Sequence, residues 1–201
     1  EGEVVLVTAS YREQAPDKDM TRGGGSTVEL SASEQNNEVT INTDSYRRTV
    51  DLKISVPLRS SLNLQTVDKG MIEVTGVHGN LEVNNINGDI RLLDVGGAAV
   101  CSTVDGDILV IFKEIFEDKP MAFTSVEGDI DLGFPGTARV GLKMKSDHGD
   151  IYTEKGWVSI HSEKDHSGLF PAWSYGTING GGAEVLVKTL NGAVFVRKLG
   201  E

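Results

Sequence analysis

The fold is decided by a repeated stretch, as in Ile86-Asn87-Gly88-Asp89-Ile90-Arg91-Leu92 and Val104-Asp105-Gly106-Asp107-Ile108-Leu109-Val110. In the regular part of the repeat, glycine recurs every nine residues, at Gly70, Gly79, Gly88, Gly97 and Gly106. Apolar residues two apart follow the turn, so Ile90 and Leu92 fall on one face of a short strand. A fixed period of this kind predicts a repeat architecture built from strands and turns.

The same turn at every corner favours a coil that always winds the same way. Asn-Gly and Asp-Gly are also hairpin signals, so a meander of short hairpins is the alternative. Full copies of the repeat at Gly106, Gly128 and Gly149 follow the preceding copy by 18, 22 and 21 residues. We therefore expect an all-β, single-stranded β-solenoid, wound as a right-handed β-helix, with about 18–22 residues per coil. Its predicted corners are Gly70, Gly79, Gly88, Gly97, Gly106, Gly128, Gly149, Gly180 and Gly192.

The pattern predicts one solenoid domain over residues 1–201. Its parts are irregular N-terminal coils or a cap at 1–60, a regular repeat region at 61–151, an aromatic-rich insertion or cap at 152–177, and final coils at 178–198. Alternating segments predict N-terminal strands at 4–10, 27–33, 38–42 and 50–56. The four-residue apolar spacing in 111–116 predicts one helical turn.

Composition excludes several classes of partner. The 201 residues include 30 Asp and Glu against 19 Lys and Arg, a net charge of −11. That charge repels phosphate backbones and anionic lipids, so we expect no nucleic-acid partner and no membrane insertion. No apolar run approaches the roughly 20 residues that span a bilayer. The single cysteine, Cys101, excludes an internal disulfide and is expected as a buried free thiol.

Residues 48–198 resemble a bacterial family known as the putative adhesins, whose function is unknown. The resemblance rests on 50–57, on 62–66, on the copies that read NGDI, DGDI, EGDI and HGDI, and on 123–132 with its continuation to Tyr152. It implies a single-stranded β-helix and an exported protein, and it carries over no catalytic residues. The chain begins at Glu1 rather than Met, which we interpret as a mature or trimmed form of an exported precursor.

Four aspartates occupy the same position of the repeat, directly after its glycine: Asp89, Asp107, Asp129 and Asp150. In stacked coils they would form a ladder about 5 Å apart. Such carboxylates either cap their own corners by accepting a backbone N–H or form a cation-binding edge. The doubled-glycine turn of calcium-binding nonapeptides is missing, so loops of that type are not expected.

An aromatic-rich stretch follows the regular repeats and contains Tyr152, Trp157, Phe170, Trp173 and Tyr175. These side chains either close the end of the solenoid core or form a ligand surface on which sugar rings stack. In the second interpretation Trp157, Trp173 and Tyr175 are the candidate binding residues.

Other site chemistry is weakly supported. His161 and His166, with Glu163 and Asp165 between them, match no strong metal-site spacing, and no metal or cofactor is expected. No nucleophile-elbow, zinc-helix or phosphate-loop motif is found. A polysaccharide-lyase-like enzyme would need a base near the acidic edge, for which Arg91, Lys143 and Lys145 are the candidates.

The sequence thus predicts a non-enzymatic, exported protein that acts as an adhesin or cell-surface binding scaffold. Its expected location is the periplasm, the cell surface or the medium, and its expected partner is an extracellular glycan or protein. Two alternatives stay open: a lyase-like enzyme that uses the acidic edge, and an envelope module for protein interaction or regulation. The sequence does not determine the oligomeric state.

Overall fold

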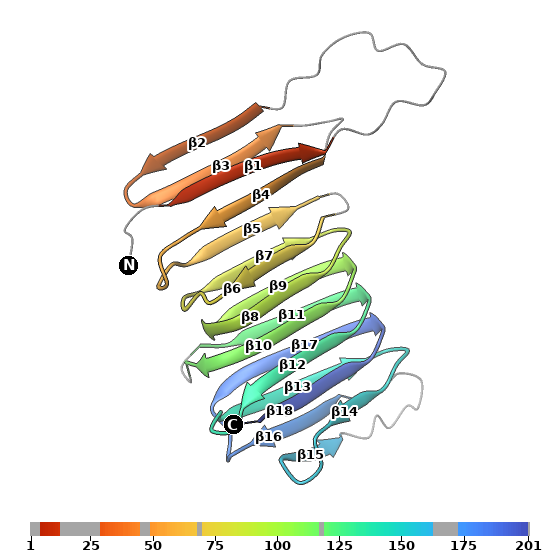
Figure 1. The fold of residues 1–201 in the computed structure, drawn as a ribbon. Coiled ribbons are helices and arrows are strands. Elements are labelled where there is room, and N and C mark those ends of the chain that lie inside the picture. The colour runs from red at the N-terminus through yellow and green to blue at the C-terminus, as the bar shows by residue number, and fades with distance from the viewer. Residues whose placement is uncertain are drawn as a thin grey trace, which may run out of the picture. The chain divides into compact units, whose positions relative to one another are not determined.

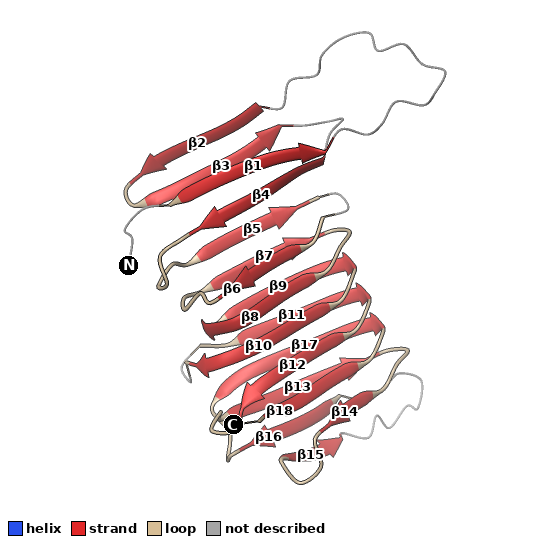
Figure 2. Ribbon diagram, viewed as in Figure 1, coloured by secondary structure: helices blue, strands red, loops and turns tan. Residues whose placement is uncertain are grey.

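The computed structural model describes residues 5–12, 29–44, 49–67, 70–116, 119–162 and 173–200, and strands are the only regular elements among them (Figure 2). The chain forms two compact units, Glu1–Pro57 and Leu58–Glu201, instead of the single domain expected from the repeat. All the predicted glycine corners belong to the second unit. The repeat therefore carries no information about the fold of the first unit.

The first unit is built from antiparallel pairs. Strand β1 (Leu6–Arg12) pairs with β4 (Thr49–Ser55), and β2 (Glu29–Gln35) pairs with β3 (Glu38–Asp44). Asn36 and Asn37 join β2 to β3 with φ of 54° and 63°, the left-handed conformation that a tight hairpin requires. Strands therefore form where alternation predicts them. Of the two predictions for 1–60, irregular coils or a cap, the antiparallel pairing argues against the coils, because coils of a solenoid would pair in parallel.

The second unit is a parallel β-solenoid of two sheets (Figure 1). The six-stranded sheet contains, in spatial order, β14 (Ile151–Thr153), β18 (Val194–Leu199), β12 (Ile130–Pro135), β10 (Ile108–Ile115), β8 (Ile90–Gly97) and β6 (Ile72–Thr75). The eight-stranded sheet contains β15 (Val158–Ser162), β16 (Ser174–Ile178), β13 (Val140–Ser146), β17 (Ala183–Asn191), β11 (Met121–Glu127), β9 (Ala99–Asp105), β7 (Leu81–Asn85) and β5 (Leu62–Thr66). Strand β16 pairs antiparallel with both β13 and β15, and the other strand pairs of these two sheets are parallel.

The order of the coils departs from the order of the chain. Strand β17 lies between β11 and β13, and β18 lies between β12 and β14, so the C-terminal strands sit among earlier ones in Figure 1. The sequence suggests that the coil at 178–198 comes last in the stack. In the structure this coil lies between earlier coils instead. Every coil has the same pattern of inward apolar residues. The spacing of these residues in the sequence therefore does not show which coils stack on one another.

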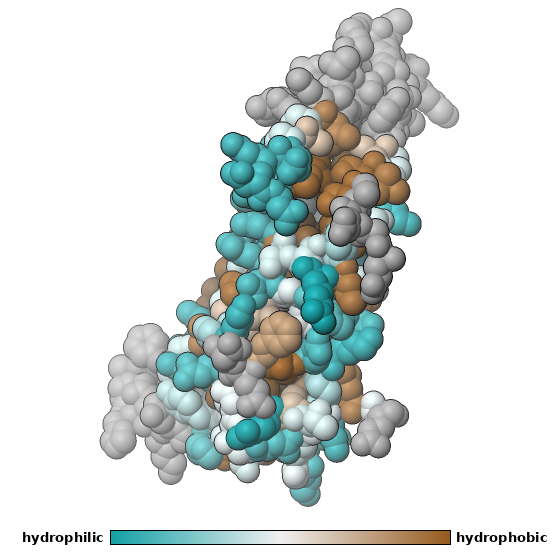
Figure 3. All heavy atoms as spheres, turned by 90° about the vertical axis from the view of Figure 1, so that its left-hand side faces the viewer, coloured by the Kyte–Doolittle hydropathy of each residue, from teal (hydrophilic) through white to brown (hydrophobic). Residues whose placement is uncertain are grey.

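Inward side chains of the two sheets form the core. Ile90, Ile108 and Ile130 are fully buried and stack in register, as strand alternation predicts. Phe112 stacks on Phe134, with ring centroids 5.3 Å apart. Some apolar side chains also reach the surface, where Figure 3 shows them in brown between hydrophilic groups.

The helical turn expected in 111–116 is wrong, because β10 continues through Ile115. The four-residue apolar spacing there arises from irregular pairing with β8, whose register shifts on either side of Phe112. On the β8 side, Asp94 is skipped in the pairing and has a φ of 56°. The shifted register leaves Phe112 buried while Lys113 and Glu114 reach solvent.

Glycine recurs at the corners because the backbones of neighbouring coils stack there too closely to leave room for a Cβ atom. A Cβ on Gly128, whose φ is +138°, would lie 2.6 Å from the carbonyl carbon of Gly106 in the next coil. In the turn before β17, it is Gly182, and not the predicted Gly180, that packs against backbone, at the carbonyl of Arg139.

A buried polar side chain three residues before the glycine completes these corners, a feature that the sequence analysis missed. Its hydroxyl donates to the glycine carbonyl of a neighbouring coil: Thr103 to Gly88 (3.2 Å), Ser125 to Gly106 (3.2 Å), Thr189 to Gly128 (3.0 Å) and Ser146 to Gly192 (2.8 Å). Asn85 serves the same role with two carbonyls. Each of these side chains is buried, so the hydrogen bond replaces water that the carbonyl has lost.

Candidate functional site

The acidic ladder forms in part. Asp89, Asp107 and Asp129 lie in consecutive coils, but Ala193 of the inserted coil separates Asp129 from Asp150. The expectation of four aspartates in successive coils is therefore corrected to three, with Asp150 one coil further along. The cause is the position of β18 between β12 and β14.

The aspartates hydrogen-bond across coils. Oδ1 of each accepts the backbone N–H at the same position of the next coil: Asp89 from Asp107 (3.1 Å), Asp107 from Asp129 (2.8 Å) and Asp129 from Ala193 (2.7 Å). The carboxylates thus satisfy backbone donors between coils, in place of the local Asx turn considered from the sequence. Within the described ranges, no group of three or more His, Cys, Asp or Glu is placed to hold a metal ion.

The aromatic residues expected to act together lie in three places. Trp173 and Tyr175 lie at the start of β16, on the outward side of the eight-stranded sheet, where Nζ of Lys143 is 4.6 Å and 5.9 Å from their ring centroids. Tyr152 belongs to β14 in the other sheet. Phe170 lies outside the described residues.

Trp157 and Trp173 lie at opposite ends of the antiparallel pair formed by β15 and β16. Trp157 precedes β15, whereas Trp173 precedes β16, and the antiparallel register therefore separates them. Six residue steps at the usual strand rise correspond to roughly 20 Å. The Nε1 atom of Trp157 is buried and has no hydrogen-bond partner among the described residues. The structure therefore does not bring Trp157 into one surface with Trp173 and Tyr175.

The histidine and cysteine candidates do not form a reactive or metal-binding site among the described residues. His161 lies exposed in β15 opposite Tyr175, while Glu163, Asp165 and His166 fall outside the described residues. Cys101 is 1% exposed, as predicted, and burial raises the pKa of its thiol to about 12. A thiol with that pKa stays protonated near neutral pH and is a poor nucleophile.

The basic residues considered for a lyase lie apart. Arg91 reaches the ladder, with Nη2 at 3.7 Å from Oδ2 of Asp89. Lys143 and Lys145 belong to β13 in the eight-stranded sheet, and Nζ of Lys145 pairs with Asp147 at 2.8 Å. The acidic ladder, in contrast, lies at the start of strands of the six-stranded sheet, so the two lysines do not join it.

A second aromatic surface, which the sequence analysis missed, lies on the outward face of the six-stranded sheet. Register places Tyr152 of β14 beside Phe195 of β18, and their rings stack with centroids 5.1 Å apart and planes 11° from parallel. The guanidinium carbon of Arg197 lies 5.2 Å from the Phe195 ring centroid, and its Nη2 bonds Oδ2 of Asp131 at 2.8 Å. Aromatic and charged side chains thus lie next to one another on this face of the sheet.

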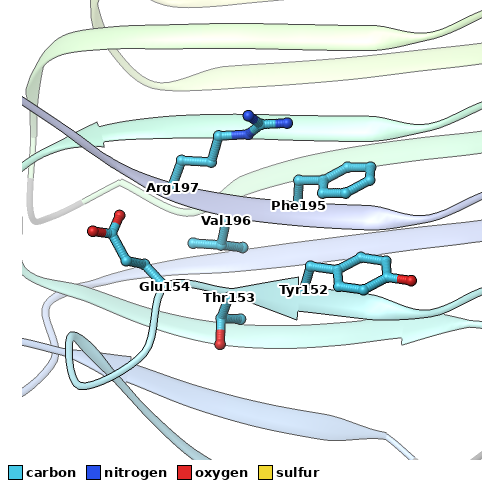
Figure 4. Close-up of a pocket in the computed structure, with 6 residues that line it drawn as sticks. All are labelled: Tyr152, Thr153, Glu154, Phe195, Val196 and Arg197. Carbon is cyan, nitrogen blue, oxygen red and sulfur yellow. The ribbon is translucent and has the colours of Figure 1, made fainter.

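These side chains line a shallow depression (Figure 4). Its lining consists of Tyr152, Thr153, Glu154, Phe195, Val196 and Arg197. Figure 4 shows the two rings on one side and Glu154 on the other, while the guanidinium group of Arg197 reaches toward the Phe195 ring. Tyr152 is 51% exposed, and Oε2 of Glu154 accepts the backbone N–H of Lys198 at 2.9 Å. An apolar platform beside fixed charges is the arrangement with which proteins hold a sugar or a planar polar group.

Electrostatics in this surface follow from its neighbours. The charge of Asp150 raises the pKa of Tyr152, helped by the hydrogen bond that the phenol donates to Oδ2 of Asp150 at 3.2 Å. Burial raises the pKa of Asp131, although the nearby Arg197 opposes that shift. Oδ1 of Asp131 is buried without a partner among the described residues, so the Arg197 pair leaves half of this carboxylate unsatisfied.

The sequence signal for this surface was present in the last repeat. Copies of the repeat place Leu109 and Asp131 at the outward position where 193–197 places Phe195. An outward aromatic residue in a repeat is unusual enough to mark a surface. Its partner Tyr152 is 43 positions away in the chain, and only the inserted coil brings the two together.

Parallel coils, two sheets and backbone-stacked glycine corners define the second unit as a β-solenoid. The chain belongs to the Toastrack DUF4097 family, which matches residues 26–197. It is also similar to the crystal structure of a putative cell adhesion protein from Clostridium sporogenes ATCC 15579, with 10% identity, a TM-score of 0.48, and coverage of 86% of this chain and 76% of that one. The comparison with curated proteins found no match.

The described residues contain no helix long and apolar enough to cross a membrane.

Proposed function

We propose that this protein is an exported, non-enzymatic scaffold of the adhesin type, which binds an extracellular glycan through the outward side chains of its solenoid. The observation that carries the proposal is the surface of Tyr152, Phe195 and Arg197 on the six-stranded sheet (Figure 4). The resemblance of residues 48–198 to adhesin-like bacterial proteins supports the same function.

The geometry supports a sugar ligand for three reasons. The half-exposed ring of Tyr152 offers an apolar platform, on which the C–H face of a sugar ring packs. Arg197 lies beside the Phe195 ring and Glu154 lies across the depression from the rings, so the two provide a donor and an acceptor for hydroxyl groups. Parallel strands on both sides of Phe195 hold the surface in place, which limits the entropy lost on binding.

The test is a binding screen against a panel of glycans and matrix proteins, followed by titration of the best ligand. We expect Tyr152→Ala to weaken binding by about 2- to 13-fold, since a stacked aromatic ring contributes about 0.5–1.5 kcal/mol beyond the area that it buries. Trp173→Ala is the matched control, because it removes an aromatic ring from the other sheet. A loss with Trp173→Ala alone would move the site to the surface predicted from the sequence, and a panel without any ligand would refute the proposal.

The export part of the proposal has its own measurement. Cell fractionation of the source organism should place the protein in the periplasm, on the cell surface or in the medium. Recovery in the cytoplasmic fraction alone would contradict it, whatever the glycan screen shows.

We also infer that the solenoid is a right-handed β-helix with about 18–22 residues per coil. The register partners Ile72, Ile90, Ile108 and Ile130 follow one another by 18, 18 and 22 residues, which supports that coil length. Crossover connections between parallel strands are right-handed in about 98% of cases, which supports the handedness. A crystal structure with left-handed winding would contradict it.

A further inference from the structure

The outward face of the eight-stranded sheet carries a cluster of lysines where β17, β13 and β16 are neighbours. Strand register places Lys143 of β13 opposite Tyr175 of β16. It also places Lys145 of β13 opposite Lys188 of β17. Trp173 directly precedes β16, two residues before Tyr175, and therefore lies on the Lys145 side of the cluster. We call these five residues the lysine face.

The lysine face is basic, although the chain as a whole carries a net charge of −11. Lys143 and Lys188 are exposed, and neither forms an ion pair with an acidic residue in the part of the chain that the structure describes. Lys145 is paired, with its Nζ 2.8 Å from Oδ1 of Asp147. Glu184 of β17 lies at the rim, two residues before the level of Lys143. Three lysines with one paired acid leave positive charge uncompensated on this face.

The proximity of the three lysines is unfavourable by itself. Neighbouring strands lie about 4.8 Å apart, which brings Lys145 and Lys188 close together. Lys143 lies on the same strand as Lys145, two residue steps or roughly 7 Å away. Like charges at such distances repel one another. An anionic group among them would relieve the repulsion and accept charge-assisted hydrogen bonds, which are stronger than neutral ones. Charge complementarity therefore favours an anionic ligand.

The aromatic rings of the lysine face restrain the lysines of β13. Nζ of Lys143 lies 4.6 Å from the ring centroid of Trp173 and 5.9 Å from that of Tyr175. Nζ of Lys145 lies 5.8 Å from the Trp173 ring centroid. A cation above an aromatic ring is attracted by the negative face of the ring. Side chains that are restrained before binding lose less rotamer entropy when a ligand arrives. Trp173 is therefore a positioning residue for the two lysines.

We propose that the lysine face binds an acidic polysaccharide, whose carboxylate or sulfate groups accept hydrogen bonds from Lys143, Lys145 and Lys188. This site is separate from the Tyr152 surface, because Tyr152 belongs to the six-stranded sheet and the lysines belong to the eight-stranded sheet. The choice of a polysaccharide rests on the proposed function, whereas the anionic character of the ligand rests on the lysines.

The net charge of the chain is compatible with this ligand. Charges on a protein surface are largely screened beyond about 8 Å at physiological ionic strength, so a bound anionic group responds mainly to the lysine face. Duplex DNA carries one charge per about 1.7 Å of its axis, and its further phosphates would lie against acids such as Asp147 and Glu184. An acidic polysaccharide spaces its charges by whole sugar rings, so fewer of them meet these acids. The surface therefore favours the polysaccharide over a nucleic acid.

The first test is binding of the full chain to immobilised polygalacturonate and to immobilised chondroitin sulfate, with neutral dextran as the reference. We expect binding to at least one of the acidic polymers, no binding to dextran, and weaker binding as the salt concentration rises. The two acidic polymers distinguish carboxylate from sulfate recognition. Binding that is insensitive to salt or equally strong on dextran would overturn the proposal. So would binding to a DNA duplex or to anionic lipid vesicles in place of both acidic polymers.

Lysine variants locate the site on the sheet. The double variant Lys143→Gln, Lys188→Gln should weaken binding about fivefold, because it removes two exposed charge contacts. Lys53→Gln with Lys113→Gln is the matched control, since it changes the net charge equally but alters exposed lysines of β4 and β10. Circular dichroism checks that each variant keeps the fold. If the two double variants bind equally well, the lysine face is not the binding site.

Aromatic variants test the positioning role and separate the two sites. Trp173→Leu should weaken binding about two- to fivefold, as expected for loss of an exposed cation–π contact, whereas Trp173→Phe keeps a ring and should bind almost normally. Equal binding by these two variants would refute the role of Trp173. Tyr152→Ala should bind the acidic polymers as well as the unaltered protein does, whether or not it loses neutral glycans. If Tyr152→Ala loses the acidic polymers and the lysine variant keeps them, the polymers bind at the Tyr152 surface and the proposal fails.

Discussion

Replacement of Gly128 by alanine tests whether the corners of the solenoid require glycine. Gly128 has a φ of +138°, a conformation that residues with a Cβ rarely adopt. The added methyl carbon would lie 2.6 Å from the carbonyl carbon of Gly106 and 3.0 Å from Oδ1 of Asp107. Both neighbours are fixed, because the hydroxyl of Ser125 donates to the carbonyl of Gly106 at 3.2 Å and the backbone N–H of Asp129 donates to Oδ1 of Asp107 at 2.8 Å.

Two costs add in this variant. Backbone strain at an unfavourable φ costs about 1–3 kcal/mol. The methyl group is about 1 Å inside the usual contact distance between carbon atoms, and overpacking of this kind costs about 1–3 kcal/mol more. We therefore expect a loss of about 4 kcal/mol in the free energy of unfolding, or roughly 8–16 °C in Tm for a chain of this length.

Urea and thermal unfolding followed by tryptophan fluorescence measure this loss. Both tryptophans of the chain, Trp157 and Trp173, lie in the second unit, so the signal reports the solenoid. Gly180→Ala is one control, since its φ is +81° but nothing lies within 4 Å of the added carbon. Gly141→Ala is the other, because it has neither a positive φ nor a close neighbour.

The expected order of destabilisation is Gly128→Ala, then Gly180→Ala, then Gly141→Ala with a change of no more than about 0.5 kcal/mol. If Gly128→Ala were no more destabilising than Gly180→Ala, close stacking of the backbone would not be the reason for the glycine. If all three variants melted together, the corner assignment itself would be refuted.

Three further predictions follow from buried and paired groups. Thr189→Val should lower the free energy of unfolding by about 1–3 kcal/mol, because it leaves the Gly128 carbonyl buried without its donor; Thr124→Val, on the outward face, should be nearly neutral in the same urea titration. Cys101 should not react with a thiol reagent at pH 8 until the protein unfolds, since its pKa is about 12; rapid labelling of the folded protein would contradict its burial. Spectroscopic titration should show that the phenol of Tyr152 ionises above its usual pKa and that Asp150→Asn lowers this value. Because the folded pKa is the higher one, the stabilising contribution of the Tyr152–Asp150 contact is complete below about pH 10 and is lost as pH rises through the folded pKa.

The regular part of the solenoid could be predicted because its signals are local. Alternation in Ile90 and Leu92 marks the inward face of a strand, and both residues are fully buried. The corner glycines follow from turn conformation and from the approach of the next coil. The inward position of Cys101 follows from the same alternation.

The first unit and the 111–116 segment show where local signals fail. Alternation locates the N-terminal strands but does not distinguish parallel from antiparallel pairing, which depends on the Asn36-Asn37 turn and on long-range partners. In 111–116 a four-residue spacing resembles a helix, although irregular pairing with β8 produces it in a strand.

The sequence by itself determined that this protein contains strands with an inward apolar face and turns that require glycine, because both depend on residues close together in the chain. Only the tertiary structure decided which coils are neighbours. Insertion of β17 and β18 separates Asp129 from Asp150 and joins Tyr152 to Phe195. Every coil presents the same backbone N–H and C=O groups along its strand edges and the same apolar interior. The local sequence pattern is therefore compatible with many stacking orders. The choice among them depends on contacts between residues that are distant in the chain.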